Sequence, residues 1–228
     1  MLWMRAMSHV VDAIHRWWRI FIRQQGDKMI TLTEDLYNNG RKAYDRIVGF
    51  KESKKKIEDK ANYLIASNSD NKAALFNLFM KNDFILWLGV RNYAWASHYQ
   101  SLLDDESTIQ HVYYCIMNAN AGKIEDTIKE LKTIFGEKYV CISAMLSLLK
   151  PDYYGIVNRH VIMALQKLII KQMVHEECDR AIIKCDKIDA KNLLIAEKYI
   201  RDLADDNVKS ARDIDKALWG LGHIWKRV

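Results

Sequence analysis

Three polar residues that could contact a substrate or a nucleic acid follow the only proline of the chain. Pro151 interrupts an apolar helical run, and a second amphipathic run opens with Asn158, Arg159 and His160. Arginine and histidine can hold a phosphate or the edge of a base, and asparagine can orient water or hydrogen-bond a sugar or a base. The alternative is that Arg159 and His160 are exposed residues of a first helical turn, which is the interpretation we favour for His160 taken alone.

A short turn between two helices precedes this elbow. Apolar residues recur at helical spacing over residues 124–135, and the run YVCISAMLSLL that follows is apolar nearly all round, as in a buried helix. Gly136, Glu137 and Lys138 join the two runs. A tight hairpin between helices presents backbone N–H groups to a phosphate, and the N-terminus of the second helix adds its dipole. Residues 123–149 are therefore predicted to be a helix, a very short hairpin and a buried helix.

The elbow itself carries two aromatic residues that could meet a base. Tyr153 and Tyr154 follow Asp152, which we interpret as a turn residue after the proline. Tyrosine rings can stack on nucleobases. The alternative, which we favour for at least one of the two tyrosines, is that the ring packs the loop onto the core.

The elements that must position these residues are predicted to be helices throughout. The chain has 228 residues, half of them apolar, with one proline and nine glycines. Sheet proteins need many tight turns and usually use more of both residues. The apolar pattern indicates an all-α, compact bundle of ten or more short helices. Its two lobes would be the N-terminal half and the part from about residue 120 onward.

The chain is predicted to have two parts. Residues 1–28 carry a basic amphipathic helix, over residues 3–24, that could dock on the core, lie on a membrane surface or be an extension preceding Met29. We favour docking. Residues 29–228 would form the helical domain, with the hairpin lobe around residues 120–173.

Local signals also mark turns, core positions and a helix start. The run NNG that ends at Gly40 is a turn signal and predicts that two helices meet there. Trp87 lies in a strongly apolar stretch and is predicted to be a core residue. Ser210 and Asp213 predict a helix that begins with an arrangement like a capping box.

Charge and hydropathy limit the class of partner without fixing it. The chain has 35 lysines and arginines against 29 acidic residues, a net charge of +6. This balance is compatible with a polyanionic partner and equally with an ordinary basic protein. The run Lys54-Lys55-Lys56 is interpreted as a solvated face. No apolar run is long enough to span a membrane, because arginines interrupt the nearest one.

The four cysteines do not form a metal-binding motif. No CxxC pair occurs, and His175, Cys178 and Cys185 give three ligands at a loose spacing where a zinc site normally needs four. We therefore expect no metal. Most of the cysteines lie in apolar stretches, where a thiol behaves as a small hydrophobe, so a reducing cytoplasmic compartment fits best.

Three stretches, taken together, resemble the helix-hairpin-helix DNA glycosylase superfamily (HhH-GPD), and within it endonuclease III and its relatives. The stretch IEDTIKELKTIFGEKYVCISAMLSLLKPDYYGIVNRHV is similar in order and length to the family's first helix, hairpin, second helix, loop and polar residue. FILWLGVRN and ARDIDKALWGLGH resemble the segment before it and the closing helix of uncharacterised prokaryotic members. The resemblance covers residues 83–165 and 208–223.

This resemblance implies a glycosylase-like fold that binds double-stranded DNA as a monomer in the cytoplasm or nucleoid, without a cofactor, and flips a damaged or modified base into a cleft. Asn158 falls on the family's catalytic carboxylate position, and Lys138 lies two residues before the position of its nucleophilic lysine, which Val140 occupies. These two are the implied catalytic residues. The implied DNA-binding residues are Gly136, Lys138, Tyr153, Arg159 and His160.

The departures from the family pattern leave three functions open. A lysine replaces the second hairpin glycine, Glu137 would repel a phosphate, and Asn158 cannot act as a base. The chain could be a base-excision N-glycosylase, with or without lyase activity at abasic sites. It could instead be a nucleic-acid-binding module that lost the chemistry, or a helical protein-interaction domain.

Overall fold

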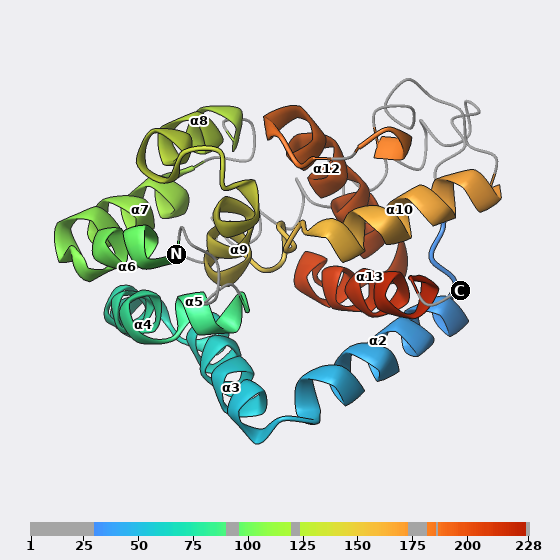
Figure 1. The fold of residues 1–228 in the computed structure, drawn as a ribbon, viewed down its shortest axis with the longest axis horizontal. Helices are drawn as coiled ribbons and strands as arrows, with labels where there is room; N and C mark the ends of the chain where they lie inside the picture. The colour runs from blue at the N-terminus through green and yellow to red at the C-terminus, as the bar shows by residue number, and fades with distance from the viewer. Residues whose placement is uncertain (1–29, 90–95, 120–123, 173–181, 186, 227–228) are drawn as a thin grey trace, which may run out of the picture. The chain divides into compact units, whose positions relative to one another are not determined.

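The computed structural model describes residues 30–89, 96–119, 124–172, 182–185 and 187–226 (Figure 1). The chain divides into two units, residues 1–30 and residues 31–228, and the second unit holds all the helices that the structure describes. The helix predicted over residues 3–24 lies outside the described residues. Within the described ranges every regular element is a helix, which confirms the all-α prediction.

The helices that the structure describes are, in chain order, α2 (Glu34–Gly49), α3 (Glu52–Ala66), α4 (Ser69–Asn82), α5 (Phe84–Trp87), α6 (Ala96–Asp104), α7 (Glu106–Asn118), α8 (Ile124–Phe135), α9 (Tyr139–Leu149), α10 (Arg159–Gln172), α12 (Ala190–Asn207) and α13 (Ala211–Trp225). None of these helices is both long enough and apolar enough to cross a membrane.

Helix α9 is the centre of the core. Every residue from Cys141 to Leu149 is buried. Helices α3, α7, α8 and α12 pack around it. This surrounds α9 with protein on all sides, as its apolar sequence predicts. The loop that leaves α9 at Leu149 therefore starts from a fixed point.

Close helix crossings hold α2, α13 and α10 together, and glycines make them possible (Figure 1). A Cβ on Gly220 would lie 2.0 Å from the carbonyl oxygen of Gly40, and a Cβ on Gly40 would lie 2.2 Å from that of Ala217. A Cβ on Gly222 would lie 2.0 Å from the carbonyl oxygen of His160 in α10. The backbones touch at these points because no side chain separates them.

The prediction of a turn at Gly40 is wrong. Helix α2 runs unbroken through this position, and Gly40 is buried against α13. Asn38, which contributed to the turn signal, instead donates to the Glu34 carboxylate along the helix at 3.2 Å. Glycine is present here because α13 approaches closely, which a local turn signal does not distinguish from a break in the helix.

Helix α12 ends in a strained residue. Val208 has φ 53° and ψ 47°, the left-handed region, and its side chain is 85% exposed. A β-branched residue in this conformation costs about 1–2 kcal/mol, whereas glycine adopts it freely. We expect Val208→Gly to raise the free energy of unfolding by about 1 kcal/mol in urea titrations, since almost no packing is lost. Val208→Ala should stay near the wild type, and a destabilised glycine variant would contradict the account.

Candidate functional site

The two helices predicted on either side of Gly136 are present as α8 and α9, with a short connection between them. Gly136 ends α8 with φ +60°, and its N–H donates to the carbonyl oxygen of Lys132 at 2.8 Å. The Tyr99 hydroxyl donates to the carbonyl oxygen of Phe135 and fixes the end of α8. A Cβ at position 136 would have room, so the positive φ is the reason for glycine here. Three residues, ending at Lys138, then connect α8 to α9.

The acidic residue of the hairpin is balanced by lysines. The Glu137 carboxylate lies 3.6 Å from the Lys132 ammonium and 3.3 Å from that of Lys187. The hydrogen bond and charge of Lys187, followed by the charge of Lys132, lower the pKa of Glu137. The repulsion that Glu137 alone would exert on a phosphate is therefore offset within the protein.

Helix α9 begins without a side-chain cap. Lys138 occupies the N-cap position, where no side chain accepts a hydrogen bond from the helix. Its carbonyl oxygen accepts the first helical bonds, from the N–H groups of Cys141 and Ile142. The preceding N–H groups, of Tyr139 and Val140, have no acceptor within the helix. This end of α9 thus carries the partial positive charge that favours an anion.

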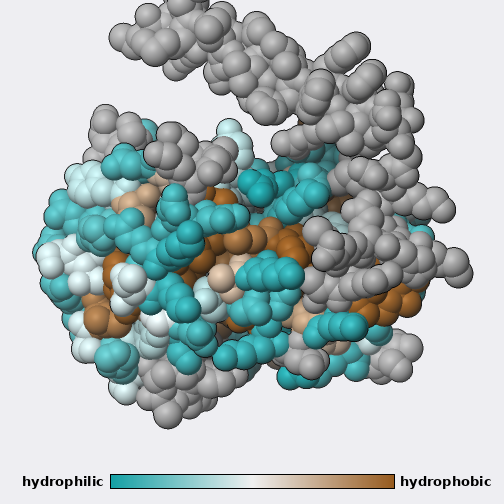
Figure 2. Space-filling model, turned by 90° about the horizontal axis from the view of Figure 1, so that it is seen from above, coloured by the Kyte–Doolittle hydropathy of each residue, from teal (hydrophilic) through white to brown (hydrophobic). Residues whose placement is uncertain are grey.

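A pocket of about 500 Å³ lies beside this uncapped end. Its lining comes from the hairpin and first turn of α9, from α10, and from Leu88, Cys185, Lys187 and Ile188. The cations are Lys138, Arg159 and Lys187, and Glu137 is the only carboxylate among the described lining residues. The volume is in the range of small-molecule and cofactor sites. Figure 2 shows the molecule from above, which is the side where α8, α10 and α12 lie in Figure 1. On this face, hydrophobic surface lies between hydrophilic side chains.

The structure brings two of the predicted site residues together on this pocket. Lys138 and Arg159 line it, although 20 positions separate them in the sequence. Gly136 lies one residue before the stretch that lines it. Asn158, His160 and Tyr153 are not among the described residues of the lining.

The elbow after α9 turns at the proline as predicted. The N–H groups of Tyr153 and Tyr154 both donate to the carbonyl oxygen of Lys150, at 3.1 and 3.0 Å, and close the turn around Pro151. Tyr154 is buried beneath the Arg201 guanidinium, whereas the Tyr153 side chain is 54% exposed. One tyrosine therefore packs the loop onto the core, and the other remains available at the surface.

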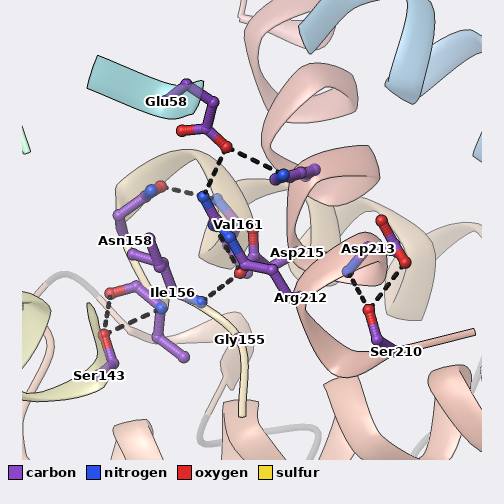
Figure 3. Close-up of polar contacts among 12 residues, drawn as sticks. Glu58, Ser143, Gly155, Ile156, Asn158, Val161, Ser210, Arg212, Asp213 and Asp215 are labelled. Carbon is purple, nitrogen blue, oxygen red and sulfur yellow. Dashed lines mark hydrogen bonds and ion pairs between the residues drawn. The ribbon is translucent and has the colours of Figure 1, made fainter. Parts of the chain in front are cut away.

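Three successive backbone amides of the elbow are held by buried side chains of three different helices, and Figure 3 shows the contacts made by Ser143 and Asp215. The pairs are Gly155 N–H with Glu197 Oε2 at 3.1 Å, Ile156 N–H with Asp215 Oδ2 at 2.5 Å, and Val157 N–H with Ser143 Oγ at 3.1 Å. A Cβ on Gly155 would lie 2.7 Å from that of Asp215, so this contact requires glycine. The elbow is anchored to α12, α13 and α9, and it delivers α10 in a fixed position.

The carboxylates that hold the elbow were not predicted from the sequence. Glu197 is 1% exposed, and burial raises its pKa well above the ordinary value. A signal was present, because Glu197 shares the buried face of α12 with Leu193, Ala196 and Ile200. A lone acid on an apolar helix face indicates a buried polar contact.

Asn158 is the N-cap of α10. Its Oδ1 accepts hydrogen bonds from the N–H groups of His160 and Val161, at 2.9 and 3.2 Å, and Figure 3 labels Asn158 and Val161. This is the usual role of asparagine at a helix start. The acceptor oxygen of Asn158 is therefore engaged by the helix, and the next residue, Arg159, is the one that reaches the pocket.

A buried group of charges lies behind the elbow. Arg212 donates to both carboxylate oxygens of Asp215, at 2.8 and 2.9 Å, and lies 3.3 Å from Glu58 of α3. Lys216 and the Trp87 indole N–H also contact Glu58, at 2.9 and 2.7 Å. Burial would raise the pKa of Glu58, but Arg212, Lys216 and Trp87 outweigh it and hold the pKa at about 2. These contacts join α3 to α13 beneath the elbow.

His160 faces the helix crossing and not the pocket. Its ring packs against those of Trp219 and His223 of α13, with centroids 5.5 and 5.0 Å apart. Burial, and then the nearby His223 and Lys226, lower the pKa of His160. This environment favours a neutral packing residue.

The described residues contain no group of three or more His, Cys, Asp or Glu side chains that could hold a metal ion. His175 and Cys178 lie outside the described residues. Comparisons with protein-family models, with curated proteins and with solved structures found no match to this chain.

Proposed function

We propose that this protein binds DNA through the hairpin between α8 and α9 and the first turn of α10, on a fold of the helix-hairpin-helix glycosylase type. The observation that carries the proposal is the pocket at the uncapped start of α9, where Lys138 and Arg159 meet. Helix N-termini and cationic side chains together are well suited to phosphate oxygens. The net charge of +6 is compatible with a polyanionic partner such as DNA.

The pocket gives this binding mode a place for one extruded nucleotide. Its walls include Ile162 and Met163, which could contact the faces of a base, while the cations lie toward the hairpin. Anchoring of the elbow to three helices keeps Arg159 in place for the strand. Preorganisation of this kind lowers the entropy lost on binding.

Glycosylase and lyase chemistry is the second candidate, and the position of Lys138 on the pocket favours it. In this reaction the uncharged lysine amine attacks C1′ of the sugar, the bond from C1′ to the base breaks, and the base leaves with a proton. Opening of the sugar ring then gives a Schiff base. Borohydride should trap this species on wild-type protein and not on Lys138→Ala. Failure to trap it on duplexes with a range of damaged bases would exclude the lyase.

Asn158 provides a separate test of hydrolysis. An asparagine in the N-cap can orient water but cannot accept its proton. If the site retains the rest of the machinery, Asn158→Asp should increase base release while keeping the cap, because aspartate caps helices as well as asparagine does. Absence of base release from both proteins would leave DNA binding as the function.

The binding proposal predicts a charge effect confined to the pocket. Lys138→Glu and Arg159→Glu should each weaken binding to a duplex by about tenfold or more at moderate salt. The slope of log affinity against log salt should fall by about one for each. Fluorescence anisotropy with a labelled duplex measures both quantities.

The matched control is Lys54→Glu, which makes the same change of charge. Lys54 belongs to the lysine run of α3, and it does not line the pocket. It should change the affinity by less than about threefold. Equal losses in all three variants would indicate diffuse charge attraction. Binding that does not depend on salt would instead favour a protein-interaction domain.

A further inference from the structure

Gln166 lines the same pocket with its amide orientation fixed. Its Nε2 lies within hydrogen-bond distance of three backbone carbonyl oxygens, those of Ile182 at 3.0 Å and of Ile183 and Cys185 at 3.3 Å. Carbonyl oxygens can only accept hydrogen bonds, so the amide nitrogen must face them. The Oε1 atom is therefore directed away from residues 182–185. In the described part of the chain no N–H or O–H group donates to it.

The spacing along α10 gives the pocket a cationic end and an accepting end. Arg159, Met163 and Gln166 lie on one helix face, since they are separated by four and three residues. The rise of an α-helix places the first and last of them about 10 Å apart. An apolar wall that includes Met163 separates the two ends. A matching ligand has an anion at one end, a flat apolar body, and an N–H donor at the other end.

We infer that the pocket binds a nucleoside monophosphate unit whose base offers an amino group to Gln166 Oε1, with its phosphate at Lys138 and Arg159. The inference deepens the proposed function and rests on it for the phosphate end. The unit can be an extruded nucleotide of a strand or a free nucleotide, because both present the same groups. Gln166 is then the residue that determines which base is accepted.

Replacement of the amino group by hydrogen tests this role directly on the wild-type full-length protein. The probes are deoxyadenosine monophosphate against its purine analogue, and deoxycytidine monophosphate against its analogue without the 4-amino group. Within at least one pair the amino compound should bind about tenfold or more tightly by calorimetry, because its analogue leaves the acceptor unpaired. Equal affinity within both pairs, or no binding of any probe in any form, would overturn the inference.

Gln166→Met keeps the length of the side chain and removes the acceptor. The ratio of affinities within the favoured pair should fall to about one, whereas the affinity of the analogue should be nearly unchanged. The ratio is the readout because the variant also loses the bonds to residues 182–185. If Gln166→Met does not fold, the comparison of the probes on the wild-type protein still tests whether the pocket selects an amino group.

A second arm places the same bases at one unpaired position of a duplex. Selectivity only in the duplex identifies an extruded nucleotide as the ligand, and selectivity only with the monophosphates identifies a free nucleotide. A fully paired duplex without these probes tests the proposed function separately. Salt-dependent binding of that duplex without selectivity for amino groups would therefore overturn the role of Gln166 and retain DNA binding.

Discussion

Gly220→Ala is expected to lower the free energy of unfolding by about 1–3 kcal/mol. The added methyl would lie 2.0 Å from the carbonyl oxygen of Gly40 and 2.8 Å from its carbonyl carbon. Both atoms belong to the backbone of α2, so the clash is relieved only if α2 and α13 move apart. Overpacking of this kind costs more than the roughly 1 kcal/mol that alanine gains over glycine in a helix. Urea unfolding followed by circular dichroism measures the change.

Gly49→Ala is the matched control, because it makes the same substitution in the helix that α13 contacts. A Cβ at this position meets no heavy atom within 4 Å. Helix propensity alone then applies, and the variant should be up to about 1 kcal/mol more stable than the wild type. If both variants shift in the same direction, close backbone contact does not hold α2 against α13.

A second crossing of α13, with α10, connects stability to the site. Gly222 allows α13 to approach the His160 carbonyl, and His160 follows the pocket residue Arg159. A side chain on Gly222 would push the first turn of α10 away from α13. A variant at Gly222 can therefore lower binding simply because less of the protein is folded. Its affinity should be calculated from the concentration of folded protein before a loss of binding is attributed to the pocket.

Features with short-range causes could be predicted from the sequence. The hairpin follows from helical spacing in α8, a glycine at its end and an apolar α9. The start of α13 follows from Ser210, whose hydroxyl accepts from the Asp213 N–H at 3.0 Å. Each signal lies within a few residues of the structure that it specifies. Tertiary contacts then stabilise the same local structure that the nearby sequence favours.

Features that depend on contacts distant in sequence could not be predicted. The NNG run reads as a turn, but the reason for Gly40 is the backbone of α13. Trp87 was expected in the core and is instead half-buried, with its indole N–H on Glu58. The elbow residues were located correctly, yet nothing near them indicates the carboxylates of Glu197 and Asp215. Those acids were visible only as charged residues on apolar helix faces.

In the candidate site, too, residues marked by local signals were predicted, and roles that depend on contacts distant in sequence were not. Lys138 and Arg159 were identified from the hairpin and the elbow, and the pocket joins them. Asn158 was expected at a cleft, and its Oδ1 is engaged in a helix cap. Gln166 was not identified, because a glutamine in an amphipathic helix has no distinctive spacing. Its role depends on residues 182–185 packing against it.

Glu58→Gln is expected to lower the free energy of unfolding by about 3 kcal/mol at neutral pH. The neutral amide leaves the buried cations Arg212 and Lys216 with only Asp215 to balance their charge. The N–H groups of the glutamine amide would also face the N–H groups of these two cations, which cannot accept a hydrogen bond. The pKa of Glu58 is held at about 2 against an ordinary 4.5, and that difference corresponds to about 3 kcal/mol. The control is Glu52→Gln in the same helix, which removes only an exposed pair with Lys56 and should cost less than about 1 kcal/mol.

The pH dependence distinguishes this electrostatic role from a loss of packing. Because folding lowers the pKa of Glu58, its contribution is fully present above about pH 4.5 and is lost as the pH falls toward 2. The wild type should therefore approach the stability of Glu58→Gln in acid, while Glu52→Gln follows the wild type throughout. Urea titrations at several pH values between about 3 and 7 give the three curves. A difference between wild type and Glu58→Gln that stays constant with pH would mean that shape, and not charge, makes Glu58 necessary for joining α3 to α13.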